Sequence, residues 1–209
     1  MTVRVFDALA PDALATALDV LRSGGLVAFP TDTVYGVGAL AFDAAAIERI
    51  YAAKGRQADK ALPILLADLA VLPEITQVLP PDVLRLGKTF WPGPLTLIVR
   101  KHESVPEAVS RDGTVGVRVP DHPIALALLR ASGPLAATSA NLSGAADPLT
   151  ADDVVAGLGD RVDLILDGGR SPGGRPSTVI DCTTRVPALI REGPISLEAV
   201  LAVLAGPAR

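Results

Sequence analysis

The sequence predicts an α/β domain in which helices flank a mixed β-sheet. Short apolar runs rich in Val, Ile and Leu alternate along the chain with stretches of helical periodicity. Such an alternation is typical of layered α/β and α+β domains. No change in composition and no low-complexity linker divides the 209 residues. Because a chain of this length can bury one core, we expect a single domain over residues 1–209.

Apolar runs bounded by turn-forming residues predict the strands. The first two, residues 4–6 and 26–29, flank a helix over about 11–23. Pro11 lies in the first turn of that helix, and Gly24 stops it. Further strands are predicted at residues 63–66, 96–99, 115–119, 135–138, 164–167 and 178–181, and a last short strand ends near Arg191.

The remaining helices are indicated by their capping residues. One helix near 43–54 stops at Gly55. Thr150 and Asp153 resemble a capping box with Asp in place of Glu, and Ser196 suits an N-cap. We therefore expect further helices over about 122–131, 150–157 and 196–204.

Composition excludes several classes of protein. No apolar run approaches the ~20 residues needed to cross a bilayer, and Asp7 and Asp12 interrupt any signal-peptide core. The single Cys182 excludes an internal disulfide and fits a reducing compartment, so we expect a cytoplasmic protein. Two histidines and one cysteine are too few for a closed zinc site, so we expect no protein-bound metal. A net charge of −4 argues against a protein that coats nucleic acid.

Two familiar motifs occur without their structural context. Residues 36–41 (GVGALA) match a dinucleotide fingerprint, but PTDTVY separates them from the preceding strand, where that motif requires its glycines. Residues 169–173 (GRSPG) match a nucleophile elbow. The residue after that serine must supply an oxyanion N–H, and Pro172 has none. We expect neither site.

The stretch KGRQADK concentrates positive charge ahead of an apolar segment. A helix C-terminus explains Lys54 alone, because a cation there is favourable against the helix dipole. That explanation does not cover Arg56 and Lys60, which lie beyond the helix and lead into a strand. The stretch therefore indicates either a solvated helix end or part of a site for a strongly anionic ligand.

Other cations and polar loops also lie near predicted strands. Arg118 lies within an apolar strand, where an arginine requires an anion, either Asp121 or a ligand carboxylate or phosphate. The loops PTDTVYG and TSANLSG are rich in hydroxyl groups, and turn chemistry explains them about as well as anion binding does. We interpret WPGPLTLIV as a packing segment. Ligands of open α/β sheets gather at strand ends, so these groups together indicate a polyphosphate site.

Seven motifs follow one another along the chain: PTDTVYG, KGRQADK, WPGPLT, VGVRVPDHP, TSANLSG, STVID and IREG. In this order they resemble the YrdC-type threonylcarbamoyl-AMP synthases, in the single-domain bacterial form without an additional C-terminal domain. The resemblance covers a core of about residues 10–205. It implies a twisted, mixed, open sheet with flanking helices and a concave basic face.

The resemblance also implies a reaction and its partners. L-Threonine, bicarbonate and ATP would give threonylcarbamoyl-adenylate, pyrophosphate and water, with Mg²⁺ entering together with ATP. The adenylate would serve a tRNA-modifying transferase complex that forms threonylcarbamoyladenosine next to the anticodon. A weak contact with tRNA itself is compatible with this role.

Carried onto this sequence, the resemblance assigns the site residues. Those implied to bind threonine are Thr33, Arg118, Ser139 and Ser177. Those implied to bind ATP are Arg56, Lys60, Thr114, Asn141 and Arg191. Lys54 and Arg56 are the implied catalytic residues, and no residue is assigned to a metal.

Two positions depart from the family pattern, and two other functions stay open. Ala61 stands where the family often has proline, and Leu65 stands where some longer relatives have a histidine near threonine. One alternative is an RNA-binding or ribosome-maturation factor that uses the same basic face, although the acidic charge balance counts against it. The other is a carbamoyl- or nucleotide-binding module without turnover of its own.

Overall fold

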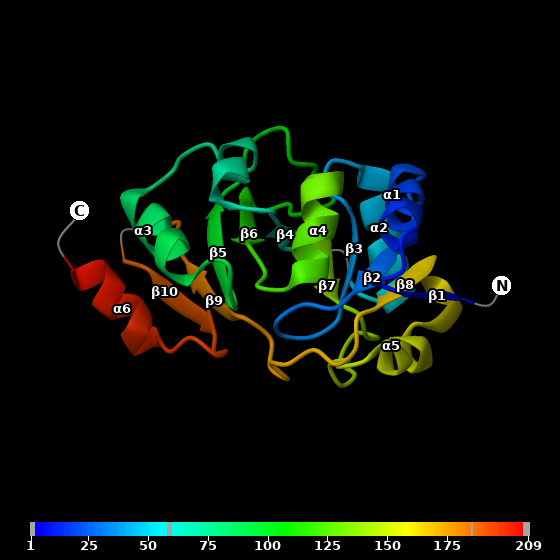
Figure 1. Ribbon diagram of the computed structural model, residues 1–209. Coiled ribbons are helices and arrows are strands. Elements are labelled where there is room, and N and C mark those ends of the chain that lie inside the picture. The colour runs from blue at the N-terminus through cyan, green and yellow to red at the C-terminus, as the bar shows by residue number, and fades with distance from the viewer. Residues whose placement is uncertain (1–2, 58–59, 185, 207–209) are drawn as a thin grey trace.

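The computed structural model describes residues 3–57, 60–184 and 186–206, which form one large mixed sheet with helices packed against it (Figure 1). The strands are β1 (Arg4–Asp7), β2 (Val27–Phe29), β3 (Gly36–Leu40), β4 (Ile64–Leu65), β5 (Leu95–Arg100), β6 (Thr114–Arg118), β7 (Leu135–Ser139), β8 (Leu164–Asp167), β9 (Thr178–Asp181) and β10 (Ala188–Arg191). The α-helices are α1 (Ala13–Arg22), α2 (Ala44–Lys54), α3 (Pro81–Phe90), α4 (Pro123–Ser132), α5 (Ala151–Gly157) and α6 (Leu197–Ala205). Two 3₁₀ helices are η1 (Leu69–Glu74) and η2 (Gly159–Arg161).

The ten strands lie in the order β1-β8-β2-β3-β7-β4-β6-β5-β9-β10. β1 and β2 run parallel to β8, β4 runs parallel to β6, and β5 runs parallel to β9. The other neighbouring pairs are antiparallel. The predicted mixed sheet with flanking helices is thus confirmed, and the two chain ends lie at opposite ends of it (Figure 1).

Helices cover both faces of the sheet at β2, the third strand from one edge. Successive side chains of a strand point to opposite faces. Leu26 and Ala28 accordingly join the larger core, which includes α2, whereas Val27 and Phe29 join a smaller core with α1 and α4. The same alternation governs β5, in which Leu97 packs into the larger core beside α3 and α6. The neighbours of Leu97 on the strand, Thr96 and Ile98, therefore point to the opposite face of the sheet.

The predicted strands and helices are present, with ends shifted by one or two residues at several of them. β3 and α3 were not predicted. β3 is glycine-rich, which is unfavourable for a strand in isolation, but an added Cβ at Gly38 would come within 3.2 Å of the Phe29 ring. α3 begins at Pro81, a residue that suits the first position of a helix, so its start carried a local signal that was missed; Gly87 in its interior weakens the helix. Packing against Phe29 favours β3 in spite of its glycines.

None of the helices in the described residues has the length and the apolar character required to span a bilayer.

The capping box predicted at α5 is present. The Thr150 hydroxyl accepts a hydrogen bond from the Asp153 N–H at 3.2 Å, and the Asp153 carboxylate accepts from the Thr150 N–H at 3.0 Å.

We expect Thr150→Ala to lower the free energy of unfolding by about 1 kcal/mol, measured by urea denaturation. Thr89→Ala, at an exposed hydroxyl within α3, is the control and should change it by less than about 0.5 kcal/mol. Equal effects of the two substitutions would contradict the cap.

Candidate functional site

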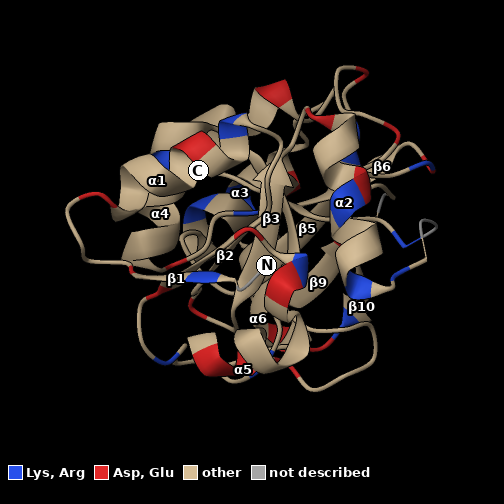
Figure 2. Cartoon of the chain, turned by 90° about the vertical axis from the view of Figure 1, so that its right-hand side faces the viewer, with Lys and Arg blue, Asp and Glu red and all other residues tan. Residues whose placement is uncertain are grey.

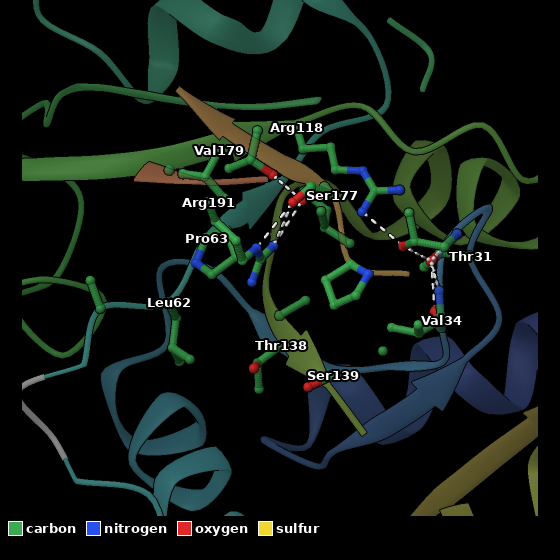
Figure 3. A pocket seen from close by; sticks show the side chains of 18 of the residues that line it. Thr31, Val34, Leu62, Pro63, Arg118, Thr138, Ser139, Ser177, Val179 and Arg191 are labelled. Carbon is green, nitrogen blue, oxygen red and sulfur yellow. Dashed lines mark hydrogen bonds between the residues drawn. The ribbon is translucent and has the colours of Figure 1, made fainter. Parts of the chain in front are cut away.

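A cavity of about 310 Å³ opens on the sheet face opposite α3 and α6, and we call it the central cavity (Figure 3). It lies where strand alternation turns Thr96, Gly116 and Arg118 away from the larger core. Its polar lining residues are Thr31, Thr33, Arg56, Thr96, Arg118, Thr138, Ser139, Asp147, Ser177 and Arg191. Figure 3 shows Arg118 and Arg191 on either side of Ser177, with Thr138 and Ser139 across the cavity.

Arg118 ends β6 and is only 6% exposed. Its Nε donates to the Gly93 carbonyl at 3.0 Å, and Nη1 donates to the Thr33 hydroxyl at 3.0 Å. Nη2 forms an ion pair with Asp32. The protein carboxylate that pairs with Arg118 is therefore Asp32 and not Asp121, whose backbone N–H donates to the same carboxylate at 3.1 Å.

The loop PTDTVYG is both a turn and part of the cavity wall. The Thr31 hydroxyl donates to the Val34 carbonyl at 2.6 Å and lies 3.0 Å from the Thr33 hydroxyl. Because Thr33 also accepts from Arg118, the turn fixes one hydroxyl against the guanidinium. Turn chemistry and site chemistry are therefore combined in one loop.

Ser177 and Arg191 form the wall at β9 and β10. Arg191 donates from Nε and Nη2 to the Ser177 carbonyl at 3.1 and 2.9 Å. The Ser177 hydroxyl lies 2.7 Å from the Thr96 hydroxyl. The packing interpretation of WPGPLTLIV is confirmed by Leu95, Leu97 and Val99 in the larger core, and Thr96 in addition faces the cavity.

Lys54 is buried behind the cavity wall at the C-terminus of α2. Its Nζ donates to the carbonyls of Ser139 and Asn141 at 2.5 Å each, and to Asn141 Oδ1 at 3.1 Å. The Ser139 hydroxyl donates to the same Oδ1 at 2.7 Å. Lys54 and Asn141 are thus not among the residues that line the cavity; they hold Ser139, which does.

The remaining predicted residues divide between the cavity and its surroundings. Arg56 lines the cavity, and it donates to the carbonyls of Lys60 at 3.2 Å and Ala61 at 3.0 Å. Lys60 is exposed and does not line it. Ala58 and Asp59 of the stretch KGRQADK lie outside the described residues.

Thr114 shares a strand face with Arg118, as its spacing of four residues requires. It nevertheless lies outside the cavity lining, and its hydroxyl donates to Asp112 at 2.7 Å. This hydrogen bond contributes most to lowering the pKa of the Asp112 carboxyl. The two positions that depart from the family pattern, Ala61 and Leu65, supply apolar lining instead.

Asp147 is the one carboxylate among the described residues that line the cavity, and it was not predicted. It lies in a proline-containing loop after TSANLSG, without a motif of its own. Its charge raises the pKa values of Lys54 and Arg191, although burial lowers both of them more strongly. Its position opposite cations became evident only from the fold.

The cations around this cavity repel one another. Burial lowers the pKa of the Arg118 guanidinium; Asp32 opposes this shift, and the charge of Arg191 adds to it. Burial also lowers the pKa of Arg191, and Arg56 lowers it further. In Figure 2, Lys and Arg positions lie on and near α2 and β10, while acidic and basic positions are mixed along the rest of the chain. An anionic ligand would relieve the repulsion, because Coulomb interactions are stronger in a partly buried site than in water.

The fold and the site define an α/β protein with a cation-rich cavity on its sheet. The chain belongs to the Sua5/YciO/YrdC family, whose model, described as telomere recombination, matches residues 19–193.

Known proteins extend this comparison. The chain is 45% identical over 194 residues to the threonylcarbamoyl-AMP synthase of Bacillus subtilis, covering 91% of this chain and 56% of that protein. It is 38% identical to a putative threonylcarbamoyl-AMP synthase of Mycobacterium tuberculosis, covering 95% of this chain and 94% of that one. The crystal structure of P. abyssi Sua5 complexed with L-threonine superimposes with a TM-score of 0.92 at 42% identity, covering 97% of this chain and 60% of that one. The chain thus spans little more than half the length of some relatives and nearly all of another.

We expect Lys54 to titrate well below a solvated lysine. Burial, and then the charge of Arg56, lowers its pKa from 10.5 to about 8. A ¹³C NMR titration of lysine-labelled protein measures that midpoint, and Lys54→Met assigns the signal. Because the unfolded chain keeps this proton up to a higher pH, wild type should gain stability relative to Lys54→Met as the pH rises from about 8 to 10.5. A midpoint near 10.5 would contradict the buried placement.

Proposed function

We propose that this chain is a threonylcarbamoyl-AMP synthase, which forms threonylcarbamoyl-adenylate, pyrophosphate and water from L-threonine, bicarbonate and ATP. The observation that carries the proposal is the convergence of Arg56, Arg118 and Arg191 with hydroxyl groups on one cavity. The names of the relatives support the synthase over the RNA-binding alternative. The L-threonine complex of P. abyssi Sua5 supports threonine as the amino acid.

The buried end of the cavity suits the amino acid. Arg118 would bind the threonine carboxylate through its remaining N–H groups, in a charge-assisted pair. The Thr33 hydroxyl lies beside the Arg118 guanidinium, and the Ser177 hydroxyl lies beside Arg191. From there they can bind the amine and the hydroxyl of threonine. Ser139, fixed by Lys54 and Asn141, faces the cavity from β7.

The more open side suits the nucleotide. Arg56 and Arg191 would hold the phosphates, with Lys60 nearer the surface. The threonine amine and bicarbonate form a carbamate with loss of water, a carbamate oxygen attacks the α-phosphorus, and pyrophosphate leaves. Fixed cations stabilise the charge that develops on the phosphoryl oxygens. Holding the two labile reactants next to each other in one cavity also lowers the activation barrier.

Magnesium enters this proposal as part of the MgATP substrate. Within residues 3–57, 60–184 and 186–206, no group of three His, Cys, Asp or Glu side chains could hold a metal ion. Asp147 is the lining carboxylate that could contact an ion carried by the phosphates. Bound there, Mg²⁺ would neutralise phosphate charge and assist the departure of pyrophosphate.

The adenylate product is an activated acyl group, so its use requires a second enzyme. We propose that a tRNA-modifying transferase takes the threonylcarbamoyl group and places it on adenosine next to the anticodon. Action in the cytoplasm, where tRNA is modified, and a weak contact with tRNA belong to the same proposal.

The proposal predicts pyrophosphate release that depends on both small substrates. Purified protein with MgATP should release pyrophosphate when L-threonine and bicarbonate are both present, and release should fall to background when either is omitted. A coupled pyrophosphate assay measures this. Equally fast release without threonine would exclude the synthase function.

Removing one cavity cation should reduce this activity strongly. We expect Arg56→Ala to lower the threonine-dependent rate by ~10-fold or more, because charge-assisted contacts to phosphate are lost. Arg22→Ala, at an exposed arginine at the end of α1, removes the same charge away from the cavity and should leave the rate within about twofold. Wild-type activity in Arg56→Ala would contradict this role and would favour the alternative that KGRQADK is a solvated helix end.

A further inference from the structure

We propose that Asp32 is a positioning residue, which fixes the orientation of the Arg118 guanidinium so that it receives the carboxylate of threonine. This inference rests on the proposed function, because it concerns the amino-acid side of the same cavity. Asp32 was not among the residues that the sequence assigned to the site.

Asp32 connects three segments around Arg118. It lies in the loop before β3, and its Oδ1 accepts from Arg118 Nη2 at the end of β6. The same oxygen accepts from the Asp121 N–H, just before α4, at 3.1 Å. The side chains of Arg118 and Asp32 are only 8% and 11% exposed. The guanidinium is therefore held by an ion pair that is itself anchored to a second backbone segment.

Asp32 acts through Arg118, since Arg118 lines the central cavity and Asp32 does not. A ligand in the cavity would contact the guanidinium, with the carboxylate behind it. Asp32 Oδ2 is buried and has no hydrogen-bond partner within the described residues. A buried carboxylate oxygen without a partner is unfavourable, so all the recorded contacts of this carboxylate are made by Oδ1. The side-chain partner recorded for Asp32 is Arg118, which fits a counter-charge that fixes this cation.

Arg118 keeps donors for a ligand while it is held in this way. A guanidinium has five N–H groups, and its recorded bonds to Gly93, Thr33 and Asp32 use three of them. Each terminal nitrogen retains a second N–H. Two such donors in a fixed plane match the two oxygens of a carboxylate. Rotation of the guanidinium by loss of Asp32 would misplace both at once.

Electrostatics alone predicts the opposite effect, which makes the inference testable. Asp32 is negative and lies beside the guanidinium, so its charge would repel a ligand carboxylate. If Asp32 mainly competed with the ligand, its neutralisation would tighten threonine binding. If Asp32 mainly orients Arg118, neutralisation would weaken threonine binding and leave ATP binding nearly unchanged.

The test is Asp32→Asn, which preserves shape and an oxygen acceptor for the Asp121 N–H. In the pyrophosphate assay, we expect the KM for L-threonine to rise ~10-fold or more and the KM for ATP to stay within about twofold. Asp163→Asn is a matched control, because Asp163 also accepts from an arginine, Arg49, and from a backbone N–H, that of Leu26, outside the cavity. Asp163→Asn should leave the KM values for L-threonine and ATP within about twofold of those of the wild-type protein.

A binding measurement separates this inference from the proposed reaction. By calorimetry, wild type should bind L-threonine more tightly than L-threoninol, which lacks the carboxylate, and Asp32→Asn should lose most of that preference. An unchanged or lower threonine KM, or an unchanged preference, would overturn the role of Asp32. If wild type shows the preference and Asp32→Asn loses it, but wild type releases no threonine-dependent pyrophosphate, the proposed reaction fails and the positioning role stands.

A second variant decides the matter if Asp32→Asn does not fold. Asp32→Glu keeps the charge and moves the carboxylate by one methylene, so the ion pair survives in a shifted position. We expect a raised threonine KM with a nearly unchanged ATP KM. A threonine KM within about twofold of wild type in this variant would overturn the inference.

Discussion

One buried guanidinium, that of Arg118, determines how the loops around the cavity are arranged. A cation that is nearly excluded from water requires both an opposite charge and oxygen acceptors. Asp32 supplies the charge, while Thr33 and the Gly93 carbonyl supply acceptors. These groups come from the loop before β3 and from the turn before β5, so the two segments converge on the end of β6. The same convergence forms the inner wall of the cavity.

The remaining cations depend on the arrangement of the sheet. Helices α1 and α4 cover one face over β2, whereas α3 and α6 cover the opposite face over β5. The face of β5, β6 and β9 that turns away from the larger core is left to line the cavity. Arg191 and Arg56 reach this face from β10 and from the segment after α2. The mutual repulsion of these cations favours binding of an anionic ligand. The carboxylate of threonine and the triphosphate of ATP are both anionic.

Sequence reasoning succeeded where the signal is local and failed where it depends on packing. The capping box at Thr150 and the stop at Gly55 are local, and both are present. β3 was missed because glycine disfavours an isolated strand, whereas in the fold Gly38 leaves room for the neighbouring Phe29 ring. The motifs located Lys54, but only the fold shows that it holds the loop containing Ser139 instead of lining the cavity. Asp32 lies in the motif PTDTVYG but was assigned no role, and Asp147 lies in no motif, because each carboxylate acquires its role from cations distant in sequence.

A crystal structure of this protein with L-threonine would test the role of Arg118 most directly. We expect the threonine carboxylate within hydrogen-bond distance of both terminal nitrogens of Arg118, with the Asp32 ion pair intact. The threonine amine should point toward the side of the cavity lined by Arg56 and Arg191, where the carbamate would meet the α-phosphorus. Threonine bound outside the central cavity, or an Arg118 that leaves Asp32 to reach the ligand, would contradict this arrangement.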